Sequence, residues 1–452
     1  MASTHSNELQ AISNPNGSLS RISQDAENVP TESTPLEVET RALPLADRGK
    51  EAYLVLAGCT IIQAPVWGSS LAFGVFQEYY TTHEFSGQAG SVATVGTTLN
   101  GIMYLMMPLS FTFLTRYPHL RRYCGPLGLV ITVGSLILSA YATKVWQLIV
   151  SQGVLCAVGS GLLFSPTTLY LEEWFIARKG LAYGTIWAGK ATAGFVFPFL
   201  MNSLLHRFGP KATLQAWAVA VAVLSTPLLF FLKPRIPLST SGSRNPRPLS
   251  FSFLKHATFW GLQLGCIVQA FGYLLPQTYI PSYAHALGIP DVTGAFLLAA
   301  FQLSAAPGAL VFGTLVDRLS PTSGILISSA GSTIAVLLFW GCSAQLALLL
   351  VFVILYGFFA GGFSSTWGGN LHEMKSQDEG MDTGLAMGLL LGGRGLGYVL
   401  SGPASVALLT NAWSTSGKWG YSTQYGPMII CTGITAIFGG SGWIWKMIKR
   451  AV

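Results

Sequence analysis

Long apolar runs alternate with short polar connections over most of the chain. Twelve of these runs are each near 20 residues, the length that an α-helix needs to cross the hydrocarbon core of a bilayer. They cover 53–77, 91–115, 124–143, 147–170, 181–205, 213–232, 257–280, 292–315, 321–341, 345–367, 383–409 and 426–446. Because lipid offers no partner for free backbone groups, the runs predict transmembrane helices.

The longest internal polar stretch, 233–256, divides these runs into two sets of six. The pattern predicts an all-α membrane protein with twelve transmembrane helices in two pseudo-symmetric six-helix bundles, 51–232 and 257–446. Residues 1–50 are rich in Ser, Glu, Asn, Pro and Thr, a composition typical of disorder, and are predicted to be a cytosolic tail. The stretch 233–256 is then a cytosolic central loop, and 447–452 a cytosolic C-terminus.

Composition agrees with this reading. Hydrophobic residues make up 51% of the chain and charged residues 10%, against about 25% charged in a soluble domain. Nineteen Lys and Arg residues fall in the segments predicted to be cytosolic and four in the outer loops, a bias that places both ends in the cytosol. The net charge of +7 is spread over short loops rather than gathered in one stripe, which argues against nucleic acid as a partner.

Cofactor and metal chemistry is not expected. The six cysteines are scattered, mostly within apolar runs, and show no spacing typical of metal ligands or a disulfide framework. The Gly-x-x-x-x-Gly-Lys-Ser/Thr pattern of a phosphate-binding loop is absent from the sequence, so direct use of ATP is not expected.

One short pattern occurs twice and carries a cation each time. Residues 180–184 (GLAYG) precede Gly189-Lys190, and residues 384–388 (GLAMG) precede Gly393-Arg394, with five positions identical in register. Each cation lies about ten residues into its helix and therefore near the bilayer midplane. A charge there costs roughly 2.5–3.5 kcal/mol on insertion scales. Two halves carrying this cost at the same place predict a duplicated bundle around a shared polar site.

Three segments resemble a known family. Residues 174–184 (WFIARKGLAYG), followed by Ala188-Gly189, are similar to the signature of monocarboxylate-transporter-like proteins. Residues 67–80 (WGSSLAFGVFQEYY) resemble the fungal branch of that group, and residues 313–318 (GTLVDR) resemble a loop motif of the major facilitator superfamily (MFS). The resemblance covers about residues 50–450 and implies a secondary transporter that works by alternating access.

The chain also departs from the family pattern. Monocarboxylate carriers typically have an Arg in helix 8, but the corresponding residues 308–313 read GALVFG and contain no Arg. The animal carriers also use a Lys in helix 1, whereas residues 52–115 contain no Lys. The resemblance to the branch in filamentous fungi implies export of a secondary metabolite. Uptake of a monocarboxylate or another small nutrient, with or without coupling to protons, is the alternative.

Eight residues are candidates for substrate binding. Lys190 and Arg394 are predicted to bind an acidic substrate, although pairing with carbonyls or hydroxyls of the bundle would also explain them. The other candidates are polar or aromatic residues within apolar runs: Gln63, Trp67, Gln269, Gln302, Trp367 and Asn370. Together they indicate a mixed polar and aromatic cavity; taken singly, each also fits helix–helix packing.

Charged residues near the predicted cytosolic helix ends are candidates for a gate. The set is Glu172, Arg178, Lys179, Asp317 and Arg318, predicted to form salt bridges between the halves or to be solvated interfacial charge. The 18 acidic residues avoid the helix midpoints, so a carboxylate proton relay is not evident. Proton coupling would then use Lys190, or His372 and Glu373.

Other classes of protein fit less well. A membrane enzyme would need His, Cys or acidic residues clustered at membrane depth, so no enzyme is expected; a non-transporting nutrient sensor stays as an alternative of another class. The expected partners are a small-molecule substrate, the lipid bilayer and, as a candidate, a proton. The chain is predicted to be monomeric and to reside in the plasma membrane, with the vacuolar membrane as the alternative.

Overall fold

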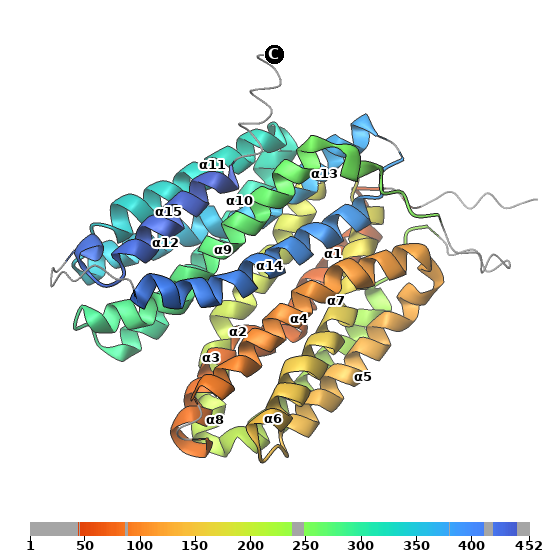
Figure 1. The fold of residues 1–452 in the computed structure, drawn as a ribbon. Coiled ribbons are helices and arrows are strands. Elements are labelled where there is room, and N and C mark those ends of the chain that lie inside the picture. Colours follow the sequence, from red (N-terminus) through yellow and green to blue (C-terminus); the bar gives the residue numbers. More distant parts are fainter. Residues whose placement is uncertain are drawn as a thin grey trace, which may run out of the picture. The chain divides into compact units, whose positions relative to one another are not determined.

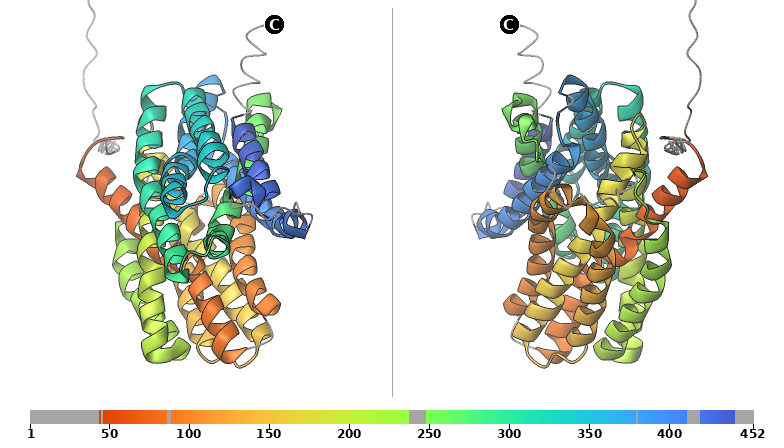
Figure 2. Two further views of the ribbon diagram at one scale, coloured as in Figure 1. Left: turned by 90° about the vertical axis from the view of Figure 1, so that its left-hand side faces the viewer. Right: turned by 90° about the vertical axis from the view of Figure 1, so that its right-hand side faces the viewer.

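The computed structural model describes residues 44, 46–85, 89–236, 248–378, 380–410 and 419–440. In this part of the chain all regular secondary structure is helical (Figures 1 and 2). Nine helical stretches there are long and apolar enough to cross a membrane. One of these nine stretches, Lys179–Phe231, contains two crossings. Helix α4 (Ala89–Arg116) and the shorter α15 (Gly426–Gly439) occupy the two remaining predicted runs. The all-α fold with twelve crossings is therefore confirmed.

The first four crossings are partly assembled from shorter helices. The first is built from α1 (Lys50–Ile61), α2 (Gln63–Leu71), α3 (Phe73–Tyr79) and the π-helix η1 (Tyr80–Glu84). The second is α4 (Ala89–Arg116), and the third is α5 (Arg121–Ser139), which follows the short η2 (Pro118–Leu120). The fourth joins α6 (Val145–Leu148), the π-helix η3 (Ile149–Leu155) and α7 (Cys156–Trp174).

The fifth and sixth crossings form one labelled element, α8 (Lys179–Phe231). Its 53 residues are interrupted at Gly209, where φ is 75°. Glycine adopts this left-handed conformation without steric cost, and Pro210 then supplies the fixed φ that suits the first turn of a new helix. The local sequence therefore turns the chain back, as the two predicted runs 181–205 and 213–232 require.

The last six crossings repeat this arrangement. After the short η4 (Ser252–Lys255) they begin with α9 (Ala257–Ala286) and α10 (Asp291–Arg318). Next come α11 (Pro321–Ile334) with η5 (Ala335–Trp340), and α12 (Leu346–Gly362) with η6 (Phe363–Ser365) and α13 (Thr366–Gln377). The chain continues through α14 (Thr383–Thr410), the short η7 (Gly420–Ser422) and α15 (Gly426–Gly439).

Several predicted segments lie wholly or partly outside the described residues. These include most of the tail 1–50, the middle of the central loop 233–256, the last residues of the run 426–446 and the C-terminus 447–452. By their contacts, residues 43–452 form one unit, so the boundaries proposed for the two halves stay predictions.

Two pairs of helices join the halves. Helix α8 packs along α10, and α4 lies beside α14 (Figure 1). Glycines set the distance in both pairs: a methyl group at Gly184 would lie 2.5 Å from the carbonyl oxygen of Ala309, and one at Gly388 would lie 2.8 Å from Cβ of Phe111. Small residues permit this close approach between membrane helices, where dispersion contacts replace the hydrophobic effect as the main attraction.

Candidate functional site

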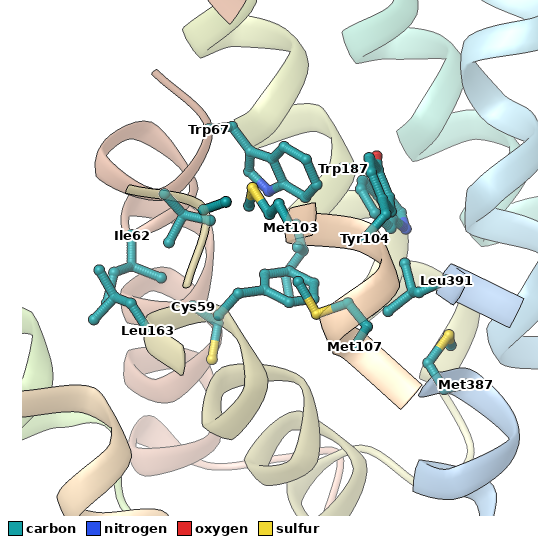
Figure 3. Close-up of a cluster of buried hydrophobic side chains, with 14 of the residues drawn as sticks. Cys59, Ile62, Trp67, Met103, Tyr104, Met107, Leu163, Trp187, Met387 and Leu391 are labelled. Carbon is teal, nitrogen blue, oxygen red and sulfur yellow. The ribbon is translucent and has the colours of Figure 1, made fainter. Parts of the chain in front are cut away.

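Lys190 lies in the first of the two crossings of α8 and contacts aromatic rings. Its Nζ donates a hydrogen bond of 2.9 Å to the hydroxyl of Tyr104 in α4. The same atom is 3.6 Å from the centroid of the Trp67 ring and 5.3 Å from that of Trp187. Figure 3 shows these three aromatic side chains converging from α2, α4 and α8. The cation is thus stabilised by one hydroxyl and by the negative faces of π systems.

Gln63 holds Trp67 in this position. It is fully buried, donates from Nε2 to the carbonyl of Cys59 at 2.7 Å, and accepts from Trp67 Nε1 at 2.9 Å. Positions four residues apart lie on one face of a helix, which brings these partners together. Gln63, predicted to bind substrate, is therefore placed as a support for the ring beneath Lys190.

Arg394 lies in α14 with a matching environment. Its Nε donates to the Tyr398 hydroxyl at 2.8 Å, and its Nη1 donates to Ser364 Oγ at 2.7 Å. The guanidinium carbon is 4.9 Å from the ring centroid of Tyr273 and 5.7 Å from that of Trp367. The sequence pointed to Arg394 and Trp367 but missed the hydroxyl partners. Tyr398 could have been found, because it lies four residues after Arg394 on the same helix face.

Aromatic contacts join the two cation environments across the boundary between the halves. Tyr104 and Tyr398 meet edge-on with ring centroids 5.3 Å apart, and Trp187 meets Trp367 edge-on at 6.4 Å. We call the whole group the paired-cation site: Trp67, Tyr104, Trp187, Lys190, Tyr273, Ser364, Trp367, Arg394 and Tyr398. Four of the eight predicted substrate-binding residues belong to it, namely Lys190, Arg394, Trp67 and Trp367.

Among the residues that the structure describes, no acid balances the charge of this site. In the described part of the chain, both cations bond only to hydroxyls and ring faces, and the ion pairs lie elsewhere. A cation–π contact contributes about 0.5–2 kcal/mol, which is less than the several kcal/mol needed to take a cation out of water. The site therefore keeps a positive potential that favours an anion.

An apolar layer lies between the site and the end of the molecule predicted to face the cytosol, which we call the inner end. Met107 of α4 and Met387 and Leu391 of α14 are buried there (Figure 3). Leu390 and Phe111 are buried in the same stretches of these two helices. From Arg394 to the start of α14 at Thr383 is about 16 Å along the helix, so the layer is several side chains thick.

Asp317 joins the halves at the inner end. Its carboxylate accepts from the backbone N–H of Gly180 at 2.8 Å and of Leu181 at 2.7 Å. These are free donors of the first turn of α8, where a negative charge also interacts favourably with the helix dipole. The acid comes from α10, in the other half, so α8 is capped by a tertiary contact.

Glu172 and Lys179 form the second part of this closure. Glu172 accepts from the Tyr183 hydroxyl at 2.9 Å, pairs with Lys179 at 3.5 Å, and accepts from the hydroxyl of Thr383 at the start of α14. In the part of the chain that the structure describes, the ion pairs Lys179–Glu172, Arg121–Glu173 and His256–Asp378 each lie within one half. The carboxylates of Asp317 and Glu172 link the halves by accepting from backbone N–H and hydroxyl donors, and the predicted salt bridges between the halves stay a prediction.

The pair His256–Asp378 lies just outside the membrane-crossing helices. His256 Nε2 and Asp378 Oδ2 are 3.4 Å apart. A hydrogen bond from Ser252 and, with a smaller effect, one from His256 hold the pKa of Asp378 below its usual range. This acid therefore anchors the end of the central loop to the end of α13.

Asp47 makes contacts at the inner end that the sequence analysis missed, because it assigned this position to the disordered tail. Its carboxylate accepts from the backbone N–H groups of Ile176, Ala177 and Arg178, at 2.9 to 3.0 Å. Its own N–H donates to the carbonyl of Trp174 at 2.9 Å. The segment before α1 thus fixes the loop that leads into α8.

The remaining predicted residues lie elsewhere. Arg178 and Arg318 are exposed at the inner end. Gln302 lies at the contact between α10 and α8, where a methyl group on Gly194 would be 2.8 Å from its amide nitrogen. Asn370 donates to the carbonyl of Thr366 in its own helix.

Gln269 lies in α9, four residues before Tyr273 of the paired-cation site. It lines a cavity of about 10 Å³ together with Ser328, Ser329, Tyr356 and Thr435, all from the last six crossings. That volume is about the size of one water molecule, so this cavity does not hold an organic substrate.

Apolar helices that cross a membrane, in two halves that meet around a pair of cations, are typical of a membrane transporter. A family model described as Major Facilitator Superfamily matches residues 59–379, so the chain belongs to this superfamily. The protein is therefore a transporter of small molecules and not an enzyme.

Named relatives extend this result. An MFS-type transporter of Aspergillus niger is 28% identical over 406 residues, which is 88% of each chain. The aspyridones efflux protein of Emericella nidulans is 25% identical over 354 residues, covering 76% of this chain and 70% of that protein. The fujikurins efflux protein of Gibberella fujikuroi is 24% identical over 362 residues, covering 78% and 74%.

Proposed function

We propose that the protein exports a small organic anion, a fungal secondary metabolite, by alternating access around Lys190 and Arg394. The observation that carries the proposal is the pair of cations, one from each half, which in the described part of the chain have hydroxyl and ring partners but no acid. A substrate carboxylate or enolate would supply the missing charge.

The direction of transport follows from the relatives. Two of them are efflux proteins by name, for aspyridones and fujikurins. The joined inner end and the partial exposure of Lys190 and Tyr398 suit the outward-facing stage of an export cycle, in which the substrate leaves toward the outside.

A strain that lacks the gene tests this proposal. We expect one acidic product to be depleted in the medium and accumulated in the cells, and we expect the wild-type gene but not the Lys190→Gln variant to restore its release. An unchanged metabolite profile would instead favour uptake, and labelled carboxylates would then be tested. Binding of a ligand without flux would favour a nutrient sensor.

The monocarboxylate-transporter-like branch is our assignment within the superfamily. Its support is the position of residues 174–184, which make contacts at the inner end. Trp174 donates to the carbonyl of Lys233, and the backbone N–H of Gly180 donates to the carboxylate of Asp317. A sequence tree in which this chain groups apart from monocarboxylate-transporter-like proteins would overturn the assignment.

We further propose a monomer in the plasma membrane that exchanges its substrate for a proton. Continuous apolar surfaces on the crossing helices suit contact with lipid. A fluorescent fusion confined to the vacuolar membrane would refute the location in the plasma membrane. A dimer in light scattering would refute the monomer. Efflux from vesicles that is insensitive to a pH gradient would refute proton coupling.

A further inference from the structure

Trp187 carries a buried hydrogen-bond donor without an acceptor. Its side chain is 8% exposed, and in the described part of the chain its indole Nε1 has no hydrogen-bond partner. By contrast, the indole N–H of Trp67 donates to Gln63, and that of Trp217 donates to Ser69. Buried donors are nearly always paired, so an unpaired one at this position requires an explanation.

The position of Trp187 supplies it. The ring lies 5.3 Å from Lys190 Nζ and contacts Trp367, which in turn lies beneath Arg394. The ring of Trp187 therefore borders the paired-cation site. A lysine has three N–H donors and an arginine five, whereas the acceptors bonded to these cations are the three hydroxyls of Tyr104, Tyr398 and Ser364. The site has a surplus of donors, which a ligand rich in acceptor oxygens would use.

Aromatic rings flank both cations of the site. Tyr273, Trp367 and Tyr398 surround Arg394, and Trp67, Tyr104 and Trp187 surround Lys190. A conjugated acid holds its acceptor oxygens in the plane of its π system. It can therefore meet donors at its edge while its faces pack against rings in offset or edge-on geometry. A saturated acid of the same size has no such faces.

We propose that the paired-cation site selects planar, conjugated acids over saturated ones, with the acidic oxygens on Lys190 and Arg394 and a further acceptor on the indole N–H of Trp187. This inference rests on the proposed transport of an organic anion and adds the class of substrate. It also assigns Trp187 as a binding residue.

The test uses two probes of equal charge and similar size, 2-naphthoate and decalin-2-carboxylate, the second being saturated and not planar. Binding is measured by calorimetry on the full chain in lipid nanodiscs. We expect naphthoate to bind at least about tenfold more tightly, although decalin is the more hydrophobic ring system. We expect Trp187→Phe, which keeps a ring but deletes the N–H, to weaken naphthoate binding about threefold to tenfold, the value of one hydrogen bond.

Trp340→Phe is the matched control. Trp340 is also buried and also has an indole nitrogen without a partner among the described residues, but it stacks on Phe352 away from the cations. We expect it to leave both affinities unchanged, so that a general effect of removing an indole is excluded. Lys190→Gln should weaken both acids.

The outcomes separate the two proposals. Equal affinity for the two acids, or tighter binding of the saturated one, would overturn planar selection while a loss in Lys190→Gln still supported an anion site. No binding of either acid at millimolar concentration would also overturn planar selection. An unchanged affinity in Trp187→Phe would remove its assigned role. If Lys190→Gln left both affinities unchanged, the proposed transport function would lose its site.

Discussion

The ring of Tyr104 meets the ring of Tyr398 at 84°, with the two centroids 5.3 Å apart. Tyr104 belongs to the first six crossings and accepts a hydrogen bond from Lys190; Tyr398 belongs to the last six and accepts one from Arg394. The two cations are thus linked through an edge-on aromatic contact between the halves, in addition to the contact of Trp187 with Trp367. A ligand that draws either cation away from its hydroxyl would disturb this contact.

Removal of the hydroxyls should therefore show coupling. We expect Tyr104→Phe and Tyr398→Phe each to reduce transport by about tenfold to a hundredfold, because a cation loses a hydrogen bond worth about 1.5–3 kcal/mol. The double variant should lose less than the sum of the two single losses, since both act on one contact. Transport rates of the four proteins in vesicles measure this, and strictly additive losses would contradict the link.

Neutralising either cation should abolish the recognition of anions. We expect Lys190→Gln or Arg394→Gln to reduce transport by roughly a hundredfold, because a charged partner of a buried anion contributes about 2–5 kcal/mol. Lys211→Gln is a suitable control: Lys211 also lies over a ring, 4.5 Å from the centroid of Tyr141, but it is exposed. Equal losses in the control and the site variants would argue against a specific role.

The contact between α8 and α10 should not tolerate a side chain. In Gly184→Ala the new methyl group would meet backbone atoms of Ala309, which cannot move aside, so we expect a cost of about 1–3 kcal/mol. Gly74→Ala is the control, because the space around Gly74 is open and alanine stabilises a helix by about 1 kcal/mol. Thermal unfolding in detergent measures both, and a stable Gly184→Ala protein would disprove the close approach.

Loss of the charge on Asp317 should open the inner end. We expect Asp317→Asn to weaken the cap on α8 by about 0.5–2 kcal/mol, which shifts the equilibrium about twofold to thirtyfold toward the inward-open state. A cysteine in place of Met387, in a background free of other cysteines, would report this opening as faster labelling from the inner side. Glu78→Gln, a neutralised acid in α3, should leave the labelling rate unchanged.

The contact between Asp47 and the loop before α8 gives a further prediction. Asp47→Ala removes an acceptor for three backbone donors, so we expect faster hydrogen exchange at residues 176–178. In Asp47→Asn these residues should exchange at an intermediate rate, since asparagine keeps one acceptor oxygen and tolerates the positive φ of 59° at this position. Glu51→Ala, an exposed acid in α1, is the control. Unchanged exchange in Asp47→Ala would disprove the anchoring role.

Hydrophobic periodicity and length determined the fold from the sequence alone. A bilayer requires about 20 apolar residues for each crossing, and Gly209 with Pro210 encodes the turn between two of them locally. The repeated pattern around Lys190 and Arg394 also identified the two central residues, because a charge within an apolar run is costly wherever the helix packs.

Only the tertiary structure decided what these residues contact. Tyr104 and Trp67 come to Lys190 from α4 and α2, whose packing against α8 no local pattern specifies, and Asp317 caps a helix that lies 136 residues earlier in the chain. Gln269, equally polar in sequence, instead lines a cavity of about the size of one water molecule. Composition and spacing determine which segments are buried in the membrane, whereas the partner of each buried polar group depends on which helix faces meet.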